Sequence, residues 1–182
     1  MRIIAGLHRG RRLVTPRGRA TRPTSDRTRE TLFALLGDLQ GIRFLDLFAG
    51  SGAVGIEALS RGATRVCFVE SARAALAALR ANLQTIDATA TTTVVACPLP
   101  GAVERLAVPF DVAFLDPPYA EATLLRETLV RLIAATVVAP QGVVVMEHDA
   151  RDTPILPAGL VAASTRRVGD TAFTFAHLRD AT

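Results

Sequence analysis

The chain has 182 residues, of which 49% are hydrophobic, and a formal net charge of +4. This length allows one domain, or one domain with a short extension, and the composition provides a sizeable core. No apolar run approaches the ~20 residues that a membrane-spanning helix needs, so we expect a soluble protein. The two cysteines, Cys67 and Cys97, lie in apolar surroundings and lack metal-ligand spacing, which predicts reduced core thiols.

The positive charge is concentrated at the N-terminus. All 21 residues of the Lys and Arg class are arginine, and residues 1–30 hold nine of them against only Asp26 and Glu30. These 30 residues therefore carry +7 and the rest of the chain −3. A basic arm on a mildly acidic body favours a phosphate-rich partner, such as a nucleic acid. The alternatives are a solvated charged face and an organellar presequence, but the glycines and prolines of the segment disfavour the long amphipathic helix of a presequence.

The first elements predict an N-terminal extension. Residues 2–5 and 12–14 are strand-like runs around His8-Arg9-Gly10, which predicts a basic β-hairpin with a glycine in its turn. We expect residues 1–24 to form this hairpin and arm, and residues 25–182 to form the main domain.

The first helix is predicted over residues 27–36. Polar residues 24–26 offer caps at its start, and Gly37 occupies the C′ position after its end. The residues expected to be buried by this helix are Leu32, Phe33, Leu35 and Leu36.

Apolar runs and amphipathic helices alternate after residue 42. The expected strands cover residues 42–47, 65–69, 91–96, 112–115 and 142–146, and the expected helices cover 53–60, 72–83 and 122–135. This pattern indicates an α/β fold with a parallel sheet covered on both faces. Two further strands, at residues 160–168 and 171–178, are separated only by Gly169-Asp170, which predicts a final hairpin and hence an antiparallel strand.

A glycine-rich loop follows the first parallel strand and extends from Asp46 to Gly52. Gly50 and Gly52 permit a tight turn and close approach of a ligand, and the amides at the next helix start can face a carboxylate or phosphate. With Gly55 the loop has the pattern G-x-G-x-x-G, and Glu70 ends the next strand, where a ribose-binding acid is expected. The spacing predicts an adenosine-type cofactor, although Glu70 alone would also suit a solvated helix cap.

Asp46 helps to distinguish between cofactors. A carboxylate just before the loop can pair with an ammonium group, whereas a dinucleotide would bring its phosphates towards the acid. S-adenosylmethionine has an ammonium group, so Asp46 favours methyl transfer over hydride transfer. An NAD-dependent oxidoreductase is the alternative built on the glycine pattern, but it gives the next motif no role.

That motif is Asp116-Pro117-Pro118-Tyr119, which follows the apolar run 112–115. The prolines lack amide donors and fix φ, so the strand ends there in a stiff turn. The turn places the Asp116 carboxylate, the Pro117 carbonyl and the Tyr119 ring on one surface that suits a flat group with an exocyclic NH2. A strand-ending turn with an incidental acid is the alternative interpretation.

The glycine loop, Glu70 and D-P-P-Y, in this order, resemble a class I S-adenosylmethionine-dependent methyltransferase that acts on exocyclic or amide nitrogens. Residues 1–6, 9–13, 22–27 and 29–33 narrow the resemblance to the RsmD family, which are bacterial 16S ribosomal RNA guanine-N2 methyltransferases. This resemblance covers nearly the whole chain. It implies a Rossmann-like sheet of seven strands with the last one antiparallel, in a bacterial cytoplasmic protein that we expect to be a monomer.

The resemblance also assigns roles to residues of this sequence. Catalysis would involve Asp116, Pro117 and Tyr119. S-adenosylmethionine would be bound by Asp46, Phe48, Gly50, Gly52, Glu70 and Cys97. The 16S ribosomal RNA, in the small subunit or its assembly intermediate, would be bound by Arg9, Arg11, Arg12, Arg22 and Thr24. No metal is expected.

Two positions depart from the family pattern. Ala34 occupies a position that is commonly asparagine, and residues 96–100 offer the adenine only backbone groups and apolar contact. Other targets remain as alternatives: DNA adenine or cytosine, or a protein glutamine. The chain has no separate DNA-reading domain, which disfavours a DNA target. A non-catalytic RNA-binding assembly factor is a further alternative, which the intact chemistry-bearing positions disfavour.

Overall fold

The computed structural model describes residues 1–16, 25–107, 109–118 and 121–179. Its seven strands are β1 (Arg43–Leu47), β2 (Arg65–Glu70), β3 (Thr92–Ala96), β4 (Phe110–Leu115), β5 (Val138–Asp149), β6 (Leu160–Val168) and β7 (Thr171–Leu178). Its helices are α1 (Asp26–Leu36), α2 (Ala53–Ser60), α3 (Arg73–Thr85) and α4 (Ala122–Ala134), with short 3₁₀ turns η1 (Thr89–Thr91) and η2 (Gly101–Arg105). None of the helices in these ranges is long and apolar enough to cross a membrane.

The strands form one sheet in the order β3-β2-β1-β4-β5-β7-β6. Neighbouring strands from β3 to β5 are parallel, whereas β7 is antiparallel to both β5 and β6. The predicted α/β class, the seven strands and the antiparallel last strand are therefore confirmed. Because β7 returns from the β6–β7 turn to pair with β5, the last strand of the chain lies inside the sheet and β6 forms its edge.

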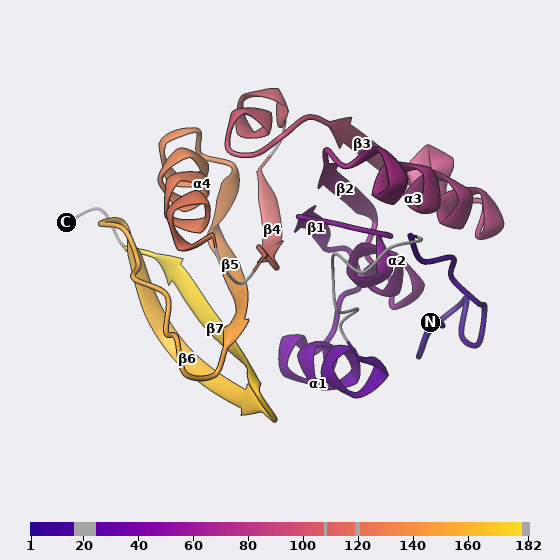
Figure 1. Ribbon diagram of the computed structural model, residues 1–182, viewed down its shortest axis with the longest axis horizontal. Coiled ribbons are helices and arrows are strands. Elements are labelled where there is room, and N and C mark those ends of the chain that lie inside the picture. The colour runs from indigo at the N-terminus through magenta and orange to yellow at the C-terminus, as the bar shows by residue number, and fades with distance from the viewer. Residues whose placement is uncertain (17–24, 108, 119–120, 180–182) are drawn as a thin grey trace.

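Helices cover the two faces of the sheet with separate cores (Figure 1). One core lies under α1, α2 and α3 and includes Phe44 and Phe114. The other lies under α4 and η2 and includes Leu45 and Leu115. Neighbouring residues of one strand thus serve opposite cores, as the alternation of side chains along a strand requires.

Helix α1 ends at the predicted Leu36 and begins one residue before the predicted start. The Ser25 hydroxyl accepts a hydrogen bond from the Thr28 amide, and Gly37 follows the last turn with φ of 76°. Leu32 and Phe33 are buried as expected, but the predicted burial of Leu35 is wrong, since it is 40% exposed. Arg29 takes its place at 0% exposure, because the buried stripe of α1 follows the spacing 29, 32, 33 and residue 35 lies off it.

The N-terminal segment, defined here as residues 1–16, turns back on itself, but its two arms do not form the regular strands of the predicted hairpin. They pair through one antiparallel bridge between Arg2 and Arg12 and through three backbone hydrogen bonds between residues 1–3 and 10–13. Other backbone groups bind helix α2 instead, which explains why no longer ladder forms. The amides of Ile4 and Ala5 donate to the two carboxylate oxygens of Glu57 at 2.8 and 2.9 Å.

Glu57 is the main attachment of this segment to α2. Its carboxylate is fully buried and also accepts a hydrogen bond from Nε of Arg61 at 2.8 Å. Next to it, Ser60 accepts from the His8 amide and donates to the Ala5 carbonyl. Buried hydrogen-bonded charge of this kind is costly to disrupt, because removing one partner leaves the others unsatisfied.

We predict that Glu57→Ala lowers the free energy of unfolding by about 3 kcal/mol and increases tryptic cleavage within residues 9–12. The matched control is Glu104→Ala, which removes an exposed ion pair with Arg131 and should cost less than about 1 kcal/mol. Urea denaturation and limited proteolysis measure the two effects. Equal losses in the two variants would show that Glu57 does not hold the segment.

Candidate active site

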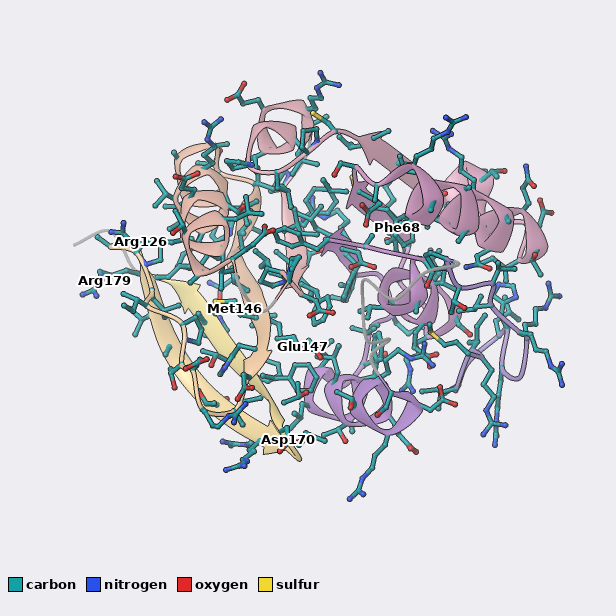
Figure 2. The ribbon with its side chains drawn as sticks, viewed as in Figure 1. Phe68, Arg126, Met146, Glu147, Asp170 and Arg179 are labelled. Atoms are coloured by element: carbon teal, nitrogen blue, oxygen red, sulfur yellow. The ribbon has the colours of Figure 1, made fainter. Side chains whose placement is uncertain are left out.

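Three carboxylates lie at the carboxyl ends of the adjacent strands β2, β1 and β4. Each acid follows a phenylalanine by two positions, in Phe44-x-Asp46, Phe68-x-Glu70 and Phe114-x-Asp116. Side chains two residues apart share a face, so the acids extend from the face that α1–α3 cover, where these phenylalanines are buried. Figure 2 shows Phe68 on this side, close to α2 and α3.

Asp46 is the deepest of the three acids. It lies on β1, between β2 and β4, and is level with Phe68 of β2 and Phe114 of β4. Glu70 and Asp116 are two residues further along their strands, or about 7 Å. Asp46 therefore lies between and below two other carboxylates.

Burial and like charge act together on Asp46, which is 2% exposed. Burial raises its pKa from 3.8 to about 7, against a lowering contribution from the hydrogen bond that the Gly55 amide donates to Oδ2 at 2.9 Å. The negative charges of Asp116 and Glu70 make smaller contributions to this rise. Among the described residues, no salt bridge involves Asp46 or Glu70, so no arginine of those residues pairs with these two carboxylates.

The three glycines of the G-x-G-x-x-G pattern have different structural roles. At Gly50, with φ of 55°, a Cβ would meet no atom within 4 Å, so this backbone is open to a ligand. At Gly52 a Cβ would lie 2.3 Å from Leu79 of α3, and at Gly55 it would lie 2.3 Å from Phe68. Gly50 is thus the position that suits ligand approach, whereas Gly52 and Gly55 allow close packing of α3 and β2.

The loop also contains Phe48, which has a positive φ of 63°. Bulky side chains rarely adopt this left-handed conformation, and such residues occur often at binding sites. Phe48 is half-buried and packs against the core under α4. The predicted cofactor residue is therefore held in a strained conformation at the start of the loop.

Glu70 makes three hydrogen bonds with backbone amides. Oε1 accepts from Ser71 and Ala72, which lead into α3, at 2.7 Å, and Oε2 accepts from the Gly50 amide at 2.8 Å. The carboxylate therefore joins the approach to α3 to the glycine loop. A carboxylate has about four acceptor positions, so one on Oε2 is left for a ligand hydroxyl.

Asp116, Pro117 and Pro118 extend beyond the end of β4, and Asp116 and Pro117 are half-buried. The Glu121 amide donates to the Pro118 carbonyl at 2.9 Å, which closes the turn into α4. Cys97 follows β3 directly, and the preceding residue Ala96 pairs with Glu70. Tyr119 lies outside the described residues.

The predicted RNA-binding arginines differ in their contacts. Arg9 and Arg12 are exposed on the N-terminal segment. Arg11 is also exposed, but its Nη1 donates to the Thr85 carbonyl at the end of α3 at 2.6 Å, so it helps to attach the segment. Arg22 and Thr24 lie outside the described residues.

Sequence reasoning missed two polar residues near the site. Glu147 directly follows Met146, whose partner on β4 is Leu115, so Glu147 lies beside Asp116 at the same edge. It is 4% exposed and extends from β5 towards α1 (Figure 2). The sequence could have indicated this residue, because it is an acid directly after an apolar run, like Glu70 and Asp116. Asn82 of α3 is fully buried, and its partners, 31 and 68 positions away, left no signal in the sequence.

A cavity of about 300 Å³ opens at the opposite edge of the sheet, near the starts of β2, β3 and β4. Its lining includes Arg65, Thr92 and Phe110 but none of the predicted site residues. The carboxyl edge, with its acids and glycine loop, is therefore the candidate active site.

Comparison with known proteins agrees with this geometry. Residues 1–177 match the family described as "Conserved hypothetical protein 95". The chain is 35% identical to Ribosomal RNA small subunit methyltransferase D of Escherichia coli K12 over 175 residues, which cover 95% of this chain and 87% of that protein. The chain belongs to this family. The resemblance to the RsmD family that the sequence suggested is thereby confirmed.

Other family members extend the likeness to sequence and structure. The methyltransferase D of Haemophilus influenzae is 36% identical over 162 residues, covering 86% of this chain and 82% of that protein. The solved structure of YhhF from Escherichia coli is 36% identical and superposes with a TM-score of 0.83, covering 98% of this chain and 97% of that one. The family fold is thus retained along nearly the whole chain.

We predict that Asp46→Asn stabilises the protein more at pH 8 than at pH 5. Between the ordinary pKa of 3.8 and the folded value of about 7, the folded chain keeps a proton that the unfolded chain releases, so stability falls as pH rises. Asparagine removes this penalty, by about 2 kcal/mol more at pH 8 than at pH 5. Urea denaturation at both pH values measures it, and a pH-independent difference would contradict the assignment.

Proposed function

We propose that the chain transfers a methyl group from S-adenosylmethionine to the exocyclic N2 of a guanine in small-subunit ribosomal RNA. The observation that carries this proposal is the position of Asp46 below Asp116 and Glu70, next to a glycine with open backbone. The RNA methyltransferases to which the chain is similar supply the substrate class.

The charge of the site supports this cofactor. S-adenosylmethionine carries an ammonium and a sulfonium, and it supplies a methyl group activated for transfer. A cation stabilises the ionised form of a buried carboxylate that lies beside two others, whereas the negatively charged phosphates of a dinucleotide would be repelled by it. Asp46 would accept from the ammonium, whose positive charge favours the ionised carboxylate and so opposes the rise of its pKa on burial.

The loop and the strand ends fit the remaining parts of the cofactor. The open backbone at Gly50 would approach the amino-acid end of the cofactor, beside Phe48 and the Gly52 turn. The acceptor position left on Oε2 of Glu70 would bind a ribose hydroxyl. Cys97, which follows β3 next to Glu70, would contact the adenine by its backbone and apolar surface.

The Asp116-Pro117 turn would bind the target nitrogen. The lone pair of a guanine N2 is delocalised into the ring, which makes it a poor nucleophile. The Asp116 carboxylate and the Pro117 carbonyl can accept its two hydrogens, which aims the lone pair at the methyl group and stabilises the positive charge that grows on nitrogen. Tyr119 would stack on the base after it leaves its own stack.

The N-terminal segment would hold the RNA backbone. Arg9 and Arg12 are exposed on it, and with Arg11, Arg22 and Thr24 they form the proposed phosphate-binding set. Ile3 and Leu13 of the segment belong to the core under α1–α3, so the segment packs as part of the domain. We therefore propose that the boundary at residue 24 separates two functions, RNA binding before it and methyl transfer after it. The segment would thus present its arginines from a fixed base.

We predict that Asp116→Ala retains cofactor binding but loses most methyl transfer, about 100-fold or more. Calorimetry with S-adenosylhomocysteine measures binding, and tritiated methyl incorporation into RNA measures turnover. Asp152→Ala, an exposed acid between β5 and β6, is the matched control and should behave as wild type. Turnover within a few-fold of wild type in Asp116→Ala would reject the role of this carboxylate.

We predict that the double variant Arg9→Ala/Arg12→Ala weakens RNA binding and lowers the slope of log K against log salt by about 2. The control double variant, Arg166→Ala/Arg167→Ala, removes two exposed arginines from β6 at the opposite end of the sheet. Its salt slope should equal that of wild type. Equal slopes in all three proteins would show that the segment is a solvated charged face and does not bind RNA phosphates.

The substrate is tested by methyl incorporation into naked 16S ribosomal RNA, assembled small subunits and naked DNA. Mass spectrometry of nucleosides from the labelled RNA identifies the modified atom. N2-methylguanosine is the expected product, whereas methyladenine or methylcytosine would overturn the guanine assignment. Incorporation into DNA alone would overturn the RNA assignment.

A further inference from the structure

Asn82 connects the N-terminal segment to the glycine loop. Its Oδ1 accepts from the Val14 amide at 2.7 Å, and its Nδ2 donates to the Val14 carbonyl and to the Ser51 carbonyl, each at 2.9 Å. The side chain is fully buried on α3. One amide group therefore holds the backbone of both segments at once.

This geometry depends on an amide side chain. The amide nitrogen of Asn82 faces two carbonyl oxygens and its oxygen faces an N–H group, so each atom has the partner that its chemistry requires. Aspartate would place an oxygen against two carbonyls, and alanine would leave three backbone groups without this partner, of which the Ser51 carbonyl is buried. No other side chain of this size could satisfy the three groups together.

Helix α3 is joined to the same two segments at further points. Glu70 accepts from the amides that lead into its start and from the Gly50 amide, and Leu79 packs against Gly52. At its other end, the Thr85 carbonyl accepts from Arg11. The helix therefore touches the glycine loop at positions 51 and 52 and the N-terminal segment at positions 11 and 14, while Glu70 of β2 holds position 50.

We propose that Asn82 is a positioning residue through which RNA binding at the N-terminal segment and cofactor binding at the glycine loop strengthen each other. This inference rests on the proposed function, since it takes the segment as the RNA-binding surface and the loop as the cofactor-binding surface. RNA phosphates held by Arg9 and Arg12 order the segment just before Val14. Asn82 transmits that order to the Ser51 carbonyl and so to the peptide that joins Ser51 to Gly52.

Coupling of this kind must be reciprocal, because each ligand changes the affinity for the other by the same factor. A ligand that holds the segment in this position also holds the Ser51 carbonyl through Asn82, and the reverse holds equally. Asn82 contacts neither proposed ligand, so its removal should affect the mutual effect of the ligands more than the binding of either alone.

Two variants break the connection at different points. Asn82→Ala removes all three hydrogen bonds, whereas Val14→Pro removes only the Val14 N–H, since proline has no amide hydrogen. The Val14 side chain is 55% exposed, so this second variant leaves the core intact even where Asn82→Ala folds poorly. Val14→Ala keeps the amide and is its matched control, and Thr128→Val, which removes a buried hydroxyl of α4, is the control for Asn82→Ala.

The experiment measures the Kd of S-adenosylhomocysteine by calorimetry, with and without saturating 16S ribosomal RNA, on full-length proteins whose folding is checked by circular dichroism. In wild type, Val14→Ala and Thr128→Val, RNA should tighten the Kd about fivefold or more. In Val14→Pro and Asn82→Ala the ratio should fall to within about twofold of one. The Kd for RNA alone should stay near the wild-type value in Val14→Pro.

Two results would overturn the inference. A wild-type ratio of one would show that the two sites are independent, and a ratio unchanged in both Val14→Pro and Asn82→Ala would show that the coupling bypasses Asn82. Failure of the proposed function is a separate outcome, recognised when wild type binds no S-adenosylhomocysteine or RNA at all.

Discussion

A carboxylate held out of water between two others is the constraint on which this site depends. Asp46 lies at the bottom of a carboxyl edge that Glu70 and Asp116 also occupy, and its ionised form is disfavoured by burial and by its neighbours. A folded chain gains nothing from this arrangement on its own, since the like charges oppose one another. The arrangement suits a cation, because a positive charge beside Asp46 relieves the repulsion among the three carboxylates.

The rest of the structure keeps that edge in shape. The Gly55 amide, at the start of α2, donates to Asp46, and Glu70 joins the approach to α3 to the loop. Packing at Gly52 and Gly55 brings α3 and β2 close to the same turn. Both helices that follow the first two strands are therefore fixed to the acids by backbone groups, which limits the movement of the loop between them.

Much of the fold could be predicted from local patterns. Apolar runs between amphipathic helices located the parallel strands, and Gly169-Asp170 located the turn between β6 and β7. Prediction failed where a residue's environment depends on distant partners. Arg29 displaced Leu35 from the buried side of α1, and the N-terminal segment bound Glu57 of α2 instead of extending its own ladder.

The candidate site was also predictable where it depends on local motifs and not where it depends on distant partners. Asp46, Gly50, Glu70 and Asp116 belong to short motifs at strand ends, and the topology brings strand ends together. The different roles of the glycines could not be predicted, because they depend on Leu79 and Phe68, which the fold packs against Gly52 and Gly55. The repeated Phe-x-acid ending of three strands was visible in the sequence, but its meaning required the register.

The attachment of the N-terminal segment has a consequence for how the protein can change over time. Glu57, Ser60 and Asn82 bind the segment through its main-chain amides and carbonyls, which every residue except proline provides in full. Side chains on the outer surface of the segment can therefore be exchanged while its seat on α2 and α3 is preserved. Mutation can alter the pattern of arginines presented to a nucleic acid without rebuilding the domain that carries out the chemistry.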